Sequence, residues 1–262
     1  MSGTNKQSSE DESSPHQNKK QRTNPPPPLE LATPQEPKKN QNKSKSKIIV
    51  LLDQAHLETV KTKNGIELVN CDMPNYILRK NQKDPKHCRP DICHQELLAL
   101  IDSPLNKAGH MQIYIRTKNK VLIQVHPQCR IPRTINRFSG LIVQLLHDMK
   151  VKSSNSKDVL LKVIKNPFSQ YLPTGTHVYG FTCKGKLFSP TAMVHRYVQS
   201  GPKGGEDAPP VCFVIGAMAS GSVKVEDHPY IEEMLCISTY PLSGAAAISR
   251  IMGAIEQKWG IV

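Results

Sequence analysis

The most chemically specific residues of this sequence are three arginines that precede an apolar, periodic run. Arg130, Arg133 and Arg137 fall within the string R-I-P-R-T-I-N-R. If a helix begins near Pro132, Arg133 and Arg137 share one face and Arg130 lies at the helix entrance. Guanidinium groups in that position would bind phosphates, helped by the helix dipole, and could stack on unpaired bases. A solvated or salt-bridged helix start is the alternative. Because the string itself contains no acid, the pattern favours contact with nucleic acid.

A second string, from His87 to His94, holds two cysteines, two histidines and the sequence Arg89-Pro-Asp91. The two cysteines have no matching distant pair, so a structural zinc site is disfavoured and no metal is expected. The proline suits the first position of a helix, and the aspartate suits the positive end of that helix. At such a helix start, Arg89 and Asp91 could orient a substrate group or form a local ion pair. The residues alone leave both interpretations open.

Two further stretches could hold a small ligand. An apolar run, Phe213–Ile215, leads into Gly216-Ala-Met-Ala-Ser-Gly221. Glycines at the carboxyl end of a strand let backbone amides approach a ligand closely. The spacing matches neither a phosphate-binding loop nor a dinucleotide-binding fingerprint. The second stretch, Ile237–Ser243, joins a strand to the last helix, for which Ser243 is a suitable cap.

Composition narrows the class of protein. The net charge of +13 over 262 residues favours a polyanionic partner, and the absence of a helix-turn-helix, zinc-finger or basic-zipper pattern disfavours DNA. No nucleophile–base arrangement or dense carboxylate set indicates hydrolysis. No apolar run approaches the ~18 residues of a membrane span, so no membrane association is expected. Seven scattered cysteines indicate reduced thiols in an intracellular protein.

The first 46 residues differ from the rest of the chain. They contain no Val, Ile, Cys or aromatic residue and hold seven of the 21 prolines. Such a segment cannot bury enough apolar surface to become ordered, so we expect a disordered tail over 1–46 and one domain over 47–262. Basic clusters in the tail could be a nuclear import signal, a loose RNA contact or a solvated surface. The tail has eight basic and five acidic residues, so most of the positive charge belongs to the domain.

The elements that must position these residues alternate between strands and helices. Continuous apolar or β-branched runs predict buried strands, and apolar residues at steps of three and one predict amphipathic helices. This order predicts an α/β fold with a largely parallel sheet and helices on both faces. The predicted strands are 48–52, 111–115, 121–125, 159–163, 176–182 and 211–215, and the predicted helices begin at 89–91, near 132 and after 243.

Several strings together identify a resemblance that covers residues 47–262. They include Arg89-Pro-Asp-Ile-Cys-His-Gln, Arg130-Ile-Pro-Arg-Thr-Ile-Asn-Arg-Phe-Ser-Gly-Leu, Leu161-Lys-Val-Ile-Lys-Asn-Pro, Gly216-Ala-Met and Ile237-Ser-Thr-Tyr-Pro-Leu-Ser. The chain resembles the eukaryotic ribosome-biogenesis methyltransferases that modify N1 of a pseudouridine in small-subunit ribosomal RNA. The resemblance implies the SPOUT class, with a C-terminal trefoil knot. It also implies a homodimer, S-adenosylmethionine as cofactor, pre-ribosome assembly factors as partners, and a nuclear or nucleolar place.

The resemblance also assigns residues. Five positions match RNA-contacting residues of the family, and the two small-ligand stretches match its cofactor pocket. Phe181 is added from a strand that departs from the family pattern. We expect Asp91 to hold or accept the proton of the pseudouridine nitrogen. The implied RNA contacts are Arg89, Asp91, Arg130, Arg133 and Arg137, and the implied cofactor contacts are Phe181, Gly216, Gly221, Ile237, Ser238, Thr239, Tyr240, Pro241 and Leu242.

Two other functions use the same residues. An assembly factor that binds RNA and protein, with dispensable methylation, also needs the arginines. An enzyme with this fold could act on another RNA or base, although the two arginine-containing strings disfavour it.

Overall fold

The apolar run that was predicted to be a strand forms β1 (Ile48–Ala55) at the centre of the sheet. The computed structural model describes residues 48–262 except 64, 154–157 and 200–208. The predicted tail therefore lies outside the described residues. Alternate side chains of β1 serve two cores: Ile48, Val50 and Leu52 face one, and Ile49 and Leu51 face the other. Burial on both faces explains why this strand reads as continuous apolar sequence.

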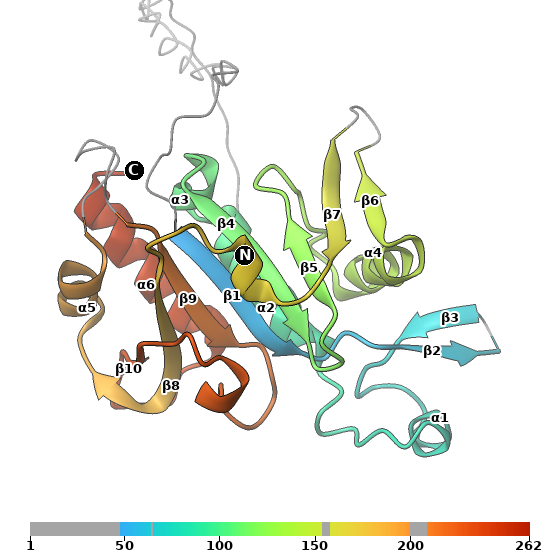
Figure 1. Ribbon diagram of the computed structural model, residues 1–262. Helices are drawn as coiled ribbons and strands as arrows, with labels where there is room; N and C mark the ends of the chain where they lie inside the picture. Colours follow the sequence, from blue (N-terminus) through green and yellow to red (C-terminus); the bar gives the residue numbers. More distant parts are fainter. Residues whose placement is uncertain (1–47, 64, 154–157, 200–208) are drawn as a thin grey trace, which may run out of the picture. The chain divides into compact units, whose positions relative to one another are not determined.

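The sheet has eight strands, and the pairing of neighbouring strands changes once across its width, from parallel to antiparallel (Figure 1). Its order is β10-β8-β9-β1-β4-β5-β7-β6, parallel from β10 to β4 and antiparallel from β4 to β6. The predicted largely parallel sheet is confirmed, and β4 and β5 form an antiparallel hairpin. The strands after β1 are β4 (Met111–Thr117), β5 (Leu122–Val125), β6 (Lys150–Lys152), β7 (Val159–Ile164), β8 (His177–Leu187), β9 (Val211–Gly216) and β10 (Glu233–Cys236).

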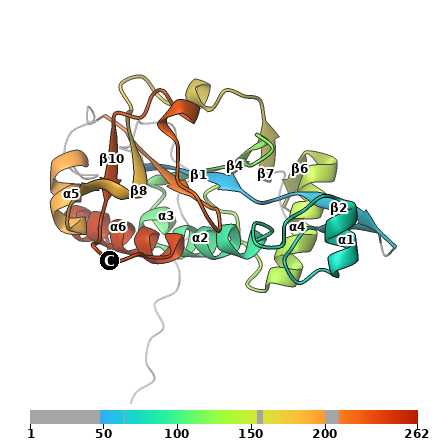
Figure 2. The ribbon, with the colours of Figure 1, turned by 90° about the horizontal axis from the view of Figure 1, so that it is seen from below.

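The helical cover is less symmetrical than predicted. Figure 2 shows the longer helices on one side of the sheet, and the side chains of α2 to α6 share one core with that face of β1. The other face is covered by loops and by two 3-10 turns, η1 (Phe168–Tyr171) and η2 (Val225–Asp227). The helices are α2 (Pro90–Asp102), α3 (Pro104–Lys107), α4 (Ile135–Asp148), α5 (Pro190–Tyr197) and α6 (Gly244–Trp259).

A small unit that was not predicted lies between β1 and α2. Strands β2 (Thr59–Thr62) and β3 (Gly65–Leu68) pair in an antiparallel ribbon, and the short helix α1 (Asn75–Lys80) follows. A separate apolar cluster, which includes Val60, Val69, Leu78 and Cys88, holds this unit together. The cluster fixes the approach of the chain to α2, where the predicted site residues begin.

Two predicted element boundaries need correction. Helix α4 begins at Ile135 and not near Pro132, so Arg130 and Arg133 precede the helix and only Arg137 belongs to it. The reason is a tertiary contact: Nε2 of His94 lies 2.7 Å from the carbonyl oxygen of Pro132, which a longer helix would need for its own first bond. Strand β8 is also longer than predicted and passes through an irregularity between its pairings at Gly180 and Lys186. The predicted trefoil knot stays a prediction.

Candidate functional site

The first half of α2 gathers three of the predicted segments. Before the helix, Nδ1 of His87 lies 3.2 Å from Oγ of Ser220, in the glycine loop. In the helix, the ring of His94 stacks on Phe138 of α4 at 4.5 Å, next to the arginine string. Two residues further, Glu96 fills the space beside Gly244, where the Ile237–Ser243 stretch enters α6. The structure therefore brings together the predicted RNA-binding and cofactor-binding segments.

At the start of α2, Arg89 and Asp91 form the local ion pair that the sequence left open. Nε of Arg89 donates to Oδ1 of Asp91 at 2.8 Å, and the second guanidinium nitrogen donates to Oδ2 at 2.7 Å. The Arg89 hydrogen bonds hold the pKa of Asp91 below its usual range, against the opposing effect of partial burial. Both side chains stay partly exposed. Asp91 is thus an ionised, weakly basic carboxylate that fixes the direction of Arg89.

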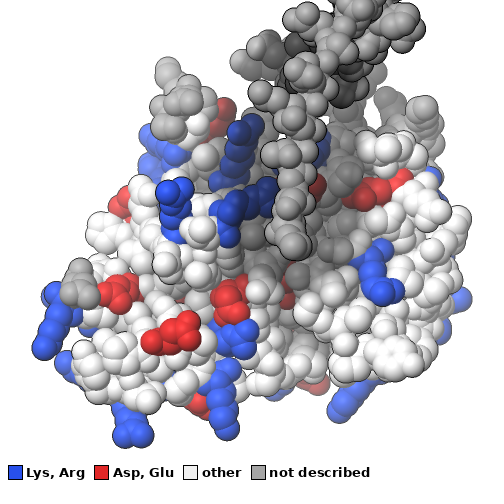
Figure 3. Space-filling model, turned by 180° about the vertical axis from the view of Figure 1, so that it is seen from behind, with Lys and Arg blue, Asp and Glu red and all other residues white. Residues whose placement is uncertain are grey.

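The arginine string lies beside α2. Arg133 pairs with Asp102, the last residue of α2, so the salt-bridged alternative holds for this arginine, with an acid supplied by another element. Arg130 and Arg137 are exposed, and the described residues provide no ion-pair partner for either. Figure 3 shows the helix-covered side, where Lys and Arg side chains gather in the upper part of the view. Arg130 and Arg137 keep guanidinium groups available for an anionic ligand.

The glycine loop follows the carboxyl end of β9. Gly216 pairs with Asp53 at the end of β1, and a Cβ atom at Gly216 would lie 2.8 Å from the methyl carbon of Met218. Gly221 has a φ of +106°, which L-residues with side chains rarely adopt. The local backbone therefore requires glycine at position 221, whereas a side chain at position 216 would have to displace the flexible end of Met218. The loop presents main chain at the edge of the sheet where α/β folds bind ligands.

The Ile237–Leu242 stretch reaches the same edge, because β10 runs parallel to β8 and β8 runs parallel to β9. Ile237 is buried, whereas Tyr240 is 77% exposed and Leu242 is 37% exposed. Two local hydrogen bonds shape the turn: the thiol of Cys236 donates to the Ser238 carbonyl, and the amide of Tyr240 donates to Oγ of Ser238. Ser243 then caps α6, as predicted, by accepting from the amide of Ala246. Exposed main chain and apolar side chains suit the adenine and ribose of a nucleoside cofactor.

Phe181 packs into the core. Its ring meets that of Phe213 edge-to-face at 5.5 Å. It lies in the irregular part of β8, beyond the residues that pair with β9. A cofactor contact at this position stays a prediction.

A buried polar network that was not predicted lies beneath the glycine loop. Asp53 at the end of β1 accepts from Nε of Arg116 at 2.5 Å, and Nε2 of His228 lies 2.9 Å from its second oxygen. The Tyr230 hydroxyl completes the network 2.6 Å from Nδ1 of His228. Burial alone would raise the pKa of Asp53, but the hydrogen bonds from His228 and Arg116 lower it overall. The main chain of Asp53 also accepts from Ala217 at 2.7 Å, so the network anchors the loop. An acid ending an apolar strand was the available sequence signal.

Glu96 is the second functional candidate that the sequence did not single out. Only 1% of the residue is exposed, and neither carboxyl oxygen has a hydrogen-bond partner among the described residues. Burial raises the pKa of Glu96 to about 8. It therefore differs from Asp91 on the same helix, whose carboxylate is paired.

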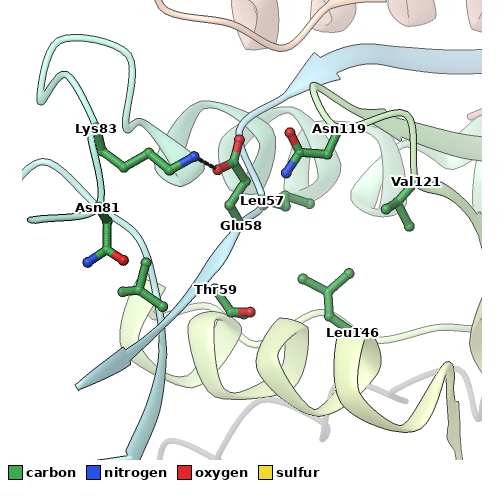
Figure 4. Close-up of a pocket in the computed structure, with 9 residues that line it drawn as sticks. Leu57, Glu58, Thr59, Asn81, Lys83, Asn119, Val121 and Leu146 are labelled. Atoms are coloured by element: carbon green, nitrogen blue, oxygen red, sulfur yellow. Dashed lines mark hydrogen bonds and ion pairs between the residues drawn. The ribbon is translucent and has the colours of Figure 1, made fainter. Parts of the chain in front are cut away.

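Two cavities of the described residues lie away from the glycine loop. One, of about 420 Å³, lies between the β1–β2 connection and α4, where Glu58 pairs with Lys83 (Figure 4). Another, of about 380 Å³, is a groove between α2 and α6, lined by residues that include Leu98, Ala99 and Met252. Neither cavity is lined by a residue predicted from the sequence to bind RNA or cofactor.

The cysteines and histidines between His87 and His94 make separate contacts and do not converge on one point. The thiol of Cys88 donates to the Asp84 carbonyl, Cys93 is fully buried in the core, and His94 contacts Pro132. Within the described ranges, no group of three or more His, Cys, Asp or Glu side chains is arranged to hold a metal. The helices of those ranges also include none with the length and apolarity needed to cross a membrane.

Comparisons with known proteins agree with this arrangement. A family model described as "EMG1/NEP1 methyltransferase" matches residues 50–256. Proteins named "Ribosomal RNA small subunit methyltransferase NEP1" are similar: the one from Drosophila melanogaster is 46% identical over 225 residues, covering 84% of this chain and 86% of the relative. The one from Homo sapiens is 47% identical over 216 residues, covering 82% and 83%.

A solved structure shares the fold. The crystal structure of Archaeoglobus fulgidus Nep1 bound to S-adenosylhomocysteine matches with a TM-score of 0.57 and 23% identity, covering 81% of this chain and 98% of the other. The α/β fold inferred from the sequence is confirmed by this match.

Proposed function

We propose, on the premise that this chain belongs to the EMG1/NEP1 methyltransferase family, that it methylates small-subunit ribosomal RNA at N1 of a pseudouridine. It is a methyltransferase that uses S-adenosylmethionine. The observation that carries the proposal is the convergence on α2. The arginine string, the glycine loop and the start of α6, which directly follows the Ile237–Ser243 stretch, all contact the first half of α2 or the residues just before it. In this proposal, a donor pocket and an RNA-binding surface lie side by side.

The residues at the sheet edge fit a nucleoside cofactor. Gly216 and Gly221 leave space that side chains would fill, and the Ile237–Leu242 turn offers exposed main chain and apolar surface. We assign the cofactor contacts to these two stretches. The bound cofactor supplies an activated methyl group on a sulfonium. The chain has to align the target nitrogen with that methyl group and exclude water.

The arginines supply the RNA contacts in this proposal. Arg130 and Arg137 bind phosphates, and Arg133 joins them when RNA competes with Asp102 for its guanidinium. Arg89, held by Asp91, points at a fixed angle from the start of α2. The target base must be unstacked to reach the pocket, which favours a loop over a duplex.

Asp91 takes an orienting role. Its lowered pKa makes it a weak proton acceptor, so its ion pair with Arg89 is the better-supported contribution. Arg89 would stabilise negative charge on the ring as the pseudouridine nitrogen loses its proton.

We extend the proposal to a homodimer. The groove between α2 and α6 combines apolar side chains such as Leu98, Ala99 and Met252 with the polar residues Asp102 and Glu256. The same groove on a second copy would bury this surface through a two-fold contact. Association with pre-ribosome assembly factors and a nucleolar place follow from the proposed substrate. A fluorescent fusion confined to another compartment would contradict that placement.

The test is calorimetric titration of the full chain with S-adenosylmethionine, using wild type, Gly221→Trp and Gly175→Trp. Gly175 is a matched control, because it also has a positive φ (+79°) with open space around it but lies between η1 and β8. We expect binding by wild type and Gly175→Trp and at least a tenfold weaker affinity for Gly221→Trp. Absence of binding by folded wild type would leave an RNA-binding assembly factor as the better account.

A further inference from the structure

Glu96 occupies a position that is unfavourable for a carboxyl group. It is 1% exposed, and both of its oxygens lack a hydrogen-bond partner in the part of the chain that the structure describes. An unpaired buried carboxylate costs several kcal/mol, so such groups are normally paired, hydrogen-bonded or held protonated. The mechanism described above does not use this side chain. A buried carboxyl group of this kind requires a partner that the described residues do not supply.

The carboxyl group lies against the start of α6. A Cβ atom at Gly244, the first residue of that helix, would overlap Oε1 of Glu96. The preceding residue, Ser243, caps the helix, and the residues before it form the Ile237–Leu242 stretch of the cofactor pocket. Glu96 is thus placed behind the end of that stretch. Its charge would act on a ligand held there without being exposed to water.

Charged groups on the neighbouring elements are directed elsewhere. Cys93 lies one turn earlier on α2 and is a titratable neighbour of Glu96. Burial, together with the negative charge of Glu96, raises the pKa of the Cys93 thiol. Glu256 of α6 accepts from the amide of Leu105, and Lys258 donates to the carbonyls of Val194 and Val198. The other such groups on elements packed against α2 are the exposed Lys107, Arg137, His147, Asp148 and Arg250, and Asp53, which pairs with Arg116 and His228.

We propose that Glu96 is a buried counter-charge for the positively charged methyl donor, and that it makes the pocket favour S-adenosylmethionine over S-adenosylhomocysteine. This inference rests on the proposed function. The two molecules differ by the methyl group and the formal positive charge of the sulfonium. Hydrogen bonds to the shared adenine, ribose and amino-acid parts cannot separate them. A buried negative charge near the pocket can distinguish the two molecules, because Coulomb interactions are strong where water is excluded.

The proposal requires proton release on binding. Because burial raises the pKa of Glu96 to about 8, the group is mostly protonated at neutral pH in the free protein. A bound cation favours the ionised form and lowers this pKa, so S-adenosylmethionine displaces a proton and the neutral product does not. The preference for the donor should therefore increase from pH 6 to pH 9, as the proton becomes easier to remove.

The experiment is a calorimetric titration of wild type and Glu96→Gln with each ligand between pH 6 and pH 9. Measurements in buffers of different ionisation enthalpy give the number of protons released. The glutamine keeps the size of the side chain and removes the charge. Since both proteins are titrated at every pH, ionisation of the ligands' own amino groups cancels in the comparison. Glu226→Gln, at an exposed position in η2, removes the same formal charge and serves as the control.

We expect the ratio of dissociation constants, product over donor, to be about tenfold higher for wild type than for Glu96→Gln at pH 8.5, with Glu226→Gln like wild type. Proton release should accompany donor binding in wild type and be absent in Glu96→Gln. Equal ratios and equal proton release in the two proteins, with both ligands bound, would overturn the counter-charge role and leave the proposed function intact. Binding of neither ligand by folded wild type would overturn both.

Discussion

Asp91 and Glu96 stand on the same helix, yet their surroundings move the pKa values of their carboxyl groups in opposite directions. Arg89 lowers that of Asp91, and burial raises that of Glu96 to about 8. The sequence pointed to Asp91 because Arg89-Pro-Asp marks a helix start. The sequence could not single out Glu96, because its raised pKa depends on the residues packed around it: an apolar core and the glycine at the start of α6. For single residues, the sequence gives the type of side chain but not how deeply that side chain is buried.

Replacing Glu96 with Gln should stabilise the free protein more at high pH than at low pH. The folded pKa, about 8, exceeds that of an exposed glutamate, so the wild-type protein loses stability as pH rises from about 4 to about 8. The expected advantage of the variant at pH 7 is roughly 3 kcal/mol relative to its value at pH 4, from ~1.36 kcal/mol per pH unit. Urea unfolding of both proteins at pH 4.5, 6 and 8 measures it. A difference that stays constant with pH would show that Glu96 does not carry the raised pKa.

Replacing Asp91 with Asn should depress methyl transfer more than RNA affinity. The arginine keeps its charge and still attracts RNA, but it loses the bidentate contact that fixes its direction. We expect the single-turnover rate to fall by about tenfold or more and the RNA dissociation constant to change by less than about threefold. Rates and filter-binding affinities are measured on one RNA. Equal losses in both would indicate that the ion pair serves RNA binding only.

At the scale of elements, strong local signals were sufficient. The continuous apolar run of β1 and the helix start at Pro90 gave the correct strand and helix, since both follow from local sequence. The ribbon of β2 and β3 and the four-residue β10 were missed, because short strands depend on their neighbours. The start of α4 was placed too early, because a distant side chain, His94, takes the Pro132 carbonyl. The network beneath the glycine loop was missed for a similar reason: its members are far apart in sequence.

Because this buried network holds the glycine loop in place, replacing Asp53 should lower the stability of the folded protein. In Asp53→Asn, the buried Arg116 and His228 lose their anionic partner, which typically costs about 3–5 kcal/mol. Asp53 has a lowered pKa, so its contribution is fully present above the pKa of an unfolded aspartate and is lost as pH falls through the folded value. Chemical unfolding at pH 7 and pH 3 should therefore show a smaller penalty for the variant at pH 3. Asp227→Asn, at an exposed position in η2, is the matched control. A loss of less than about 1 kcal/mol at pH 7 would show that the network is not an anchor.

At the scale of the whole molecule, net charge and the order of motifs were the informative quantities. The excess of basic residues indicated a polyanion, and several sequence strings together indicated the family, which the match over residues 50–256 confirms. The assembly state depends on the surfaces that the folded chain exposes, and neither the net charge nor the sequence motifs describe those surfaces. The groove between α2 and α6 is formed by two helices that are far apart in sequence and pack together only in the folded protein.

Ala99→Arg should disrupt the proposed homodimer. The substitution places a charged, bulky side chain in the groove, where two copies would have to pack apolar atoms against each other. Light scattering should then give a mass near the 29.2 kDa of one chain, whereas wild type should give twice that value. Gln144→Arg, on an exposed part of α4, should leave the dimer unchanged. A dimeric Ala99→Arg protein would place the interface elsewhere.

The most direct test of the central claim is methyl transfer to a defined RNA. A small-subunit ribosomal RNA hairpin is prepared with either pseudouridine or uridine in its loop and incubated with the full chain and S-adenosylmethionine. Nucleoside mass spectrometry then locates the added methyl group. We predict N1-methylpseudouridine from the first RNA, no methylation of the second, and a strongly reduced yield with Gly221→Trp. Absence of product from a folded wild type that binds both RNA and cofactor, or equal methylation of the uridine hairpin, would contradict the claim.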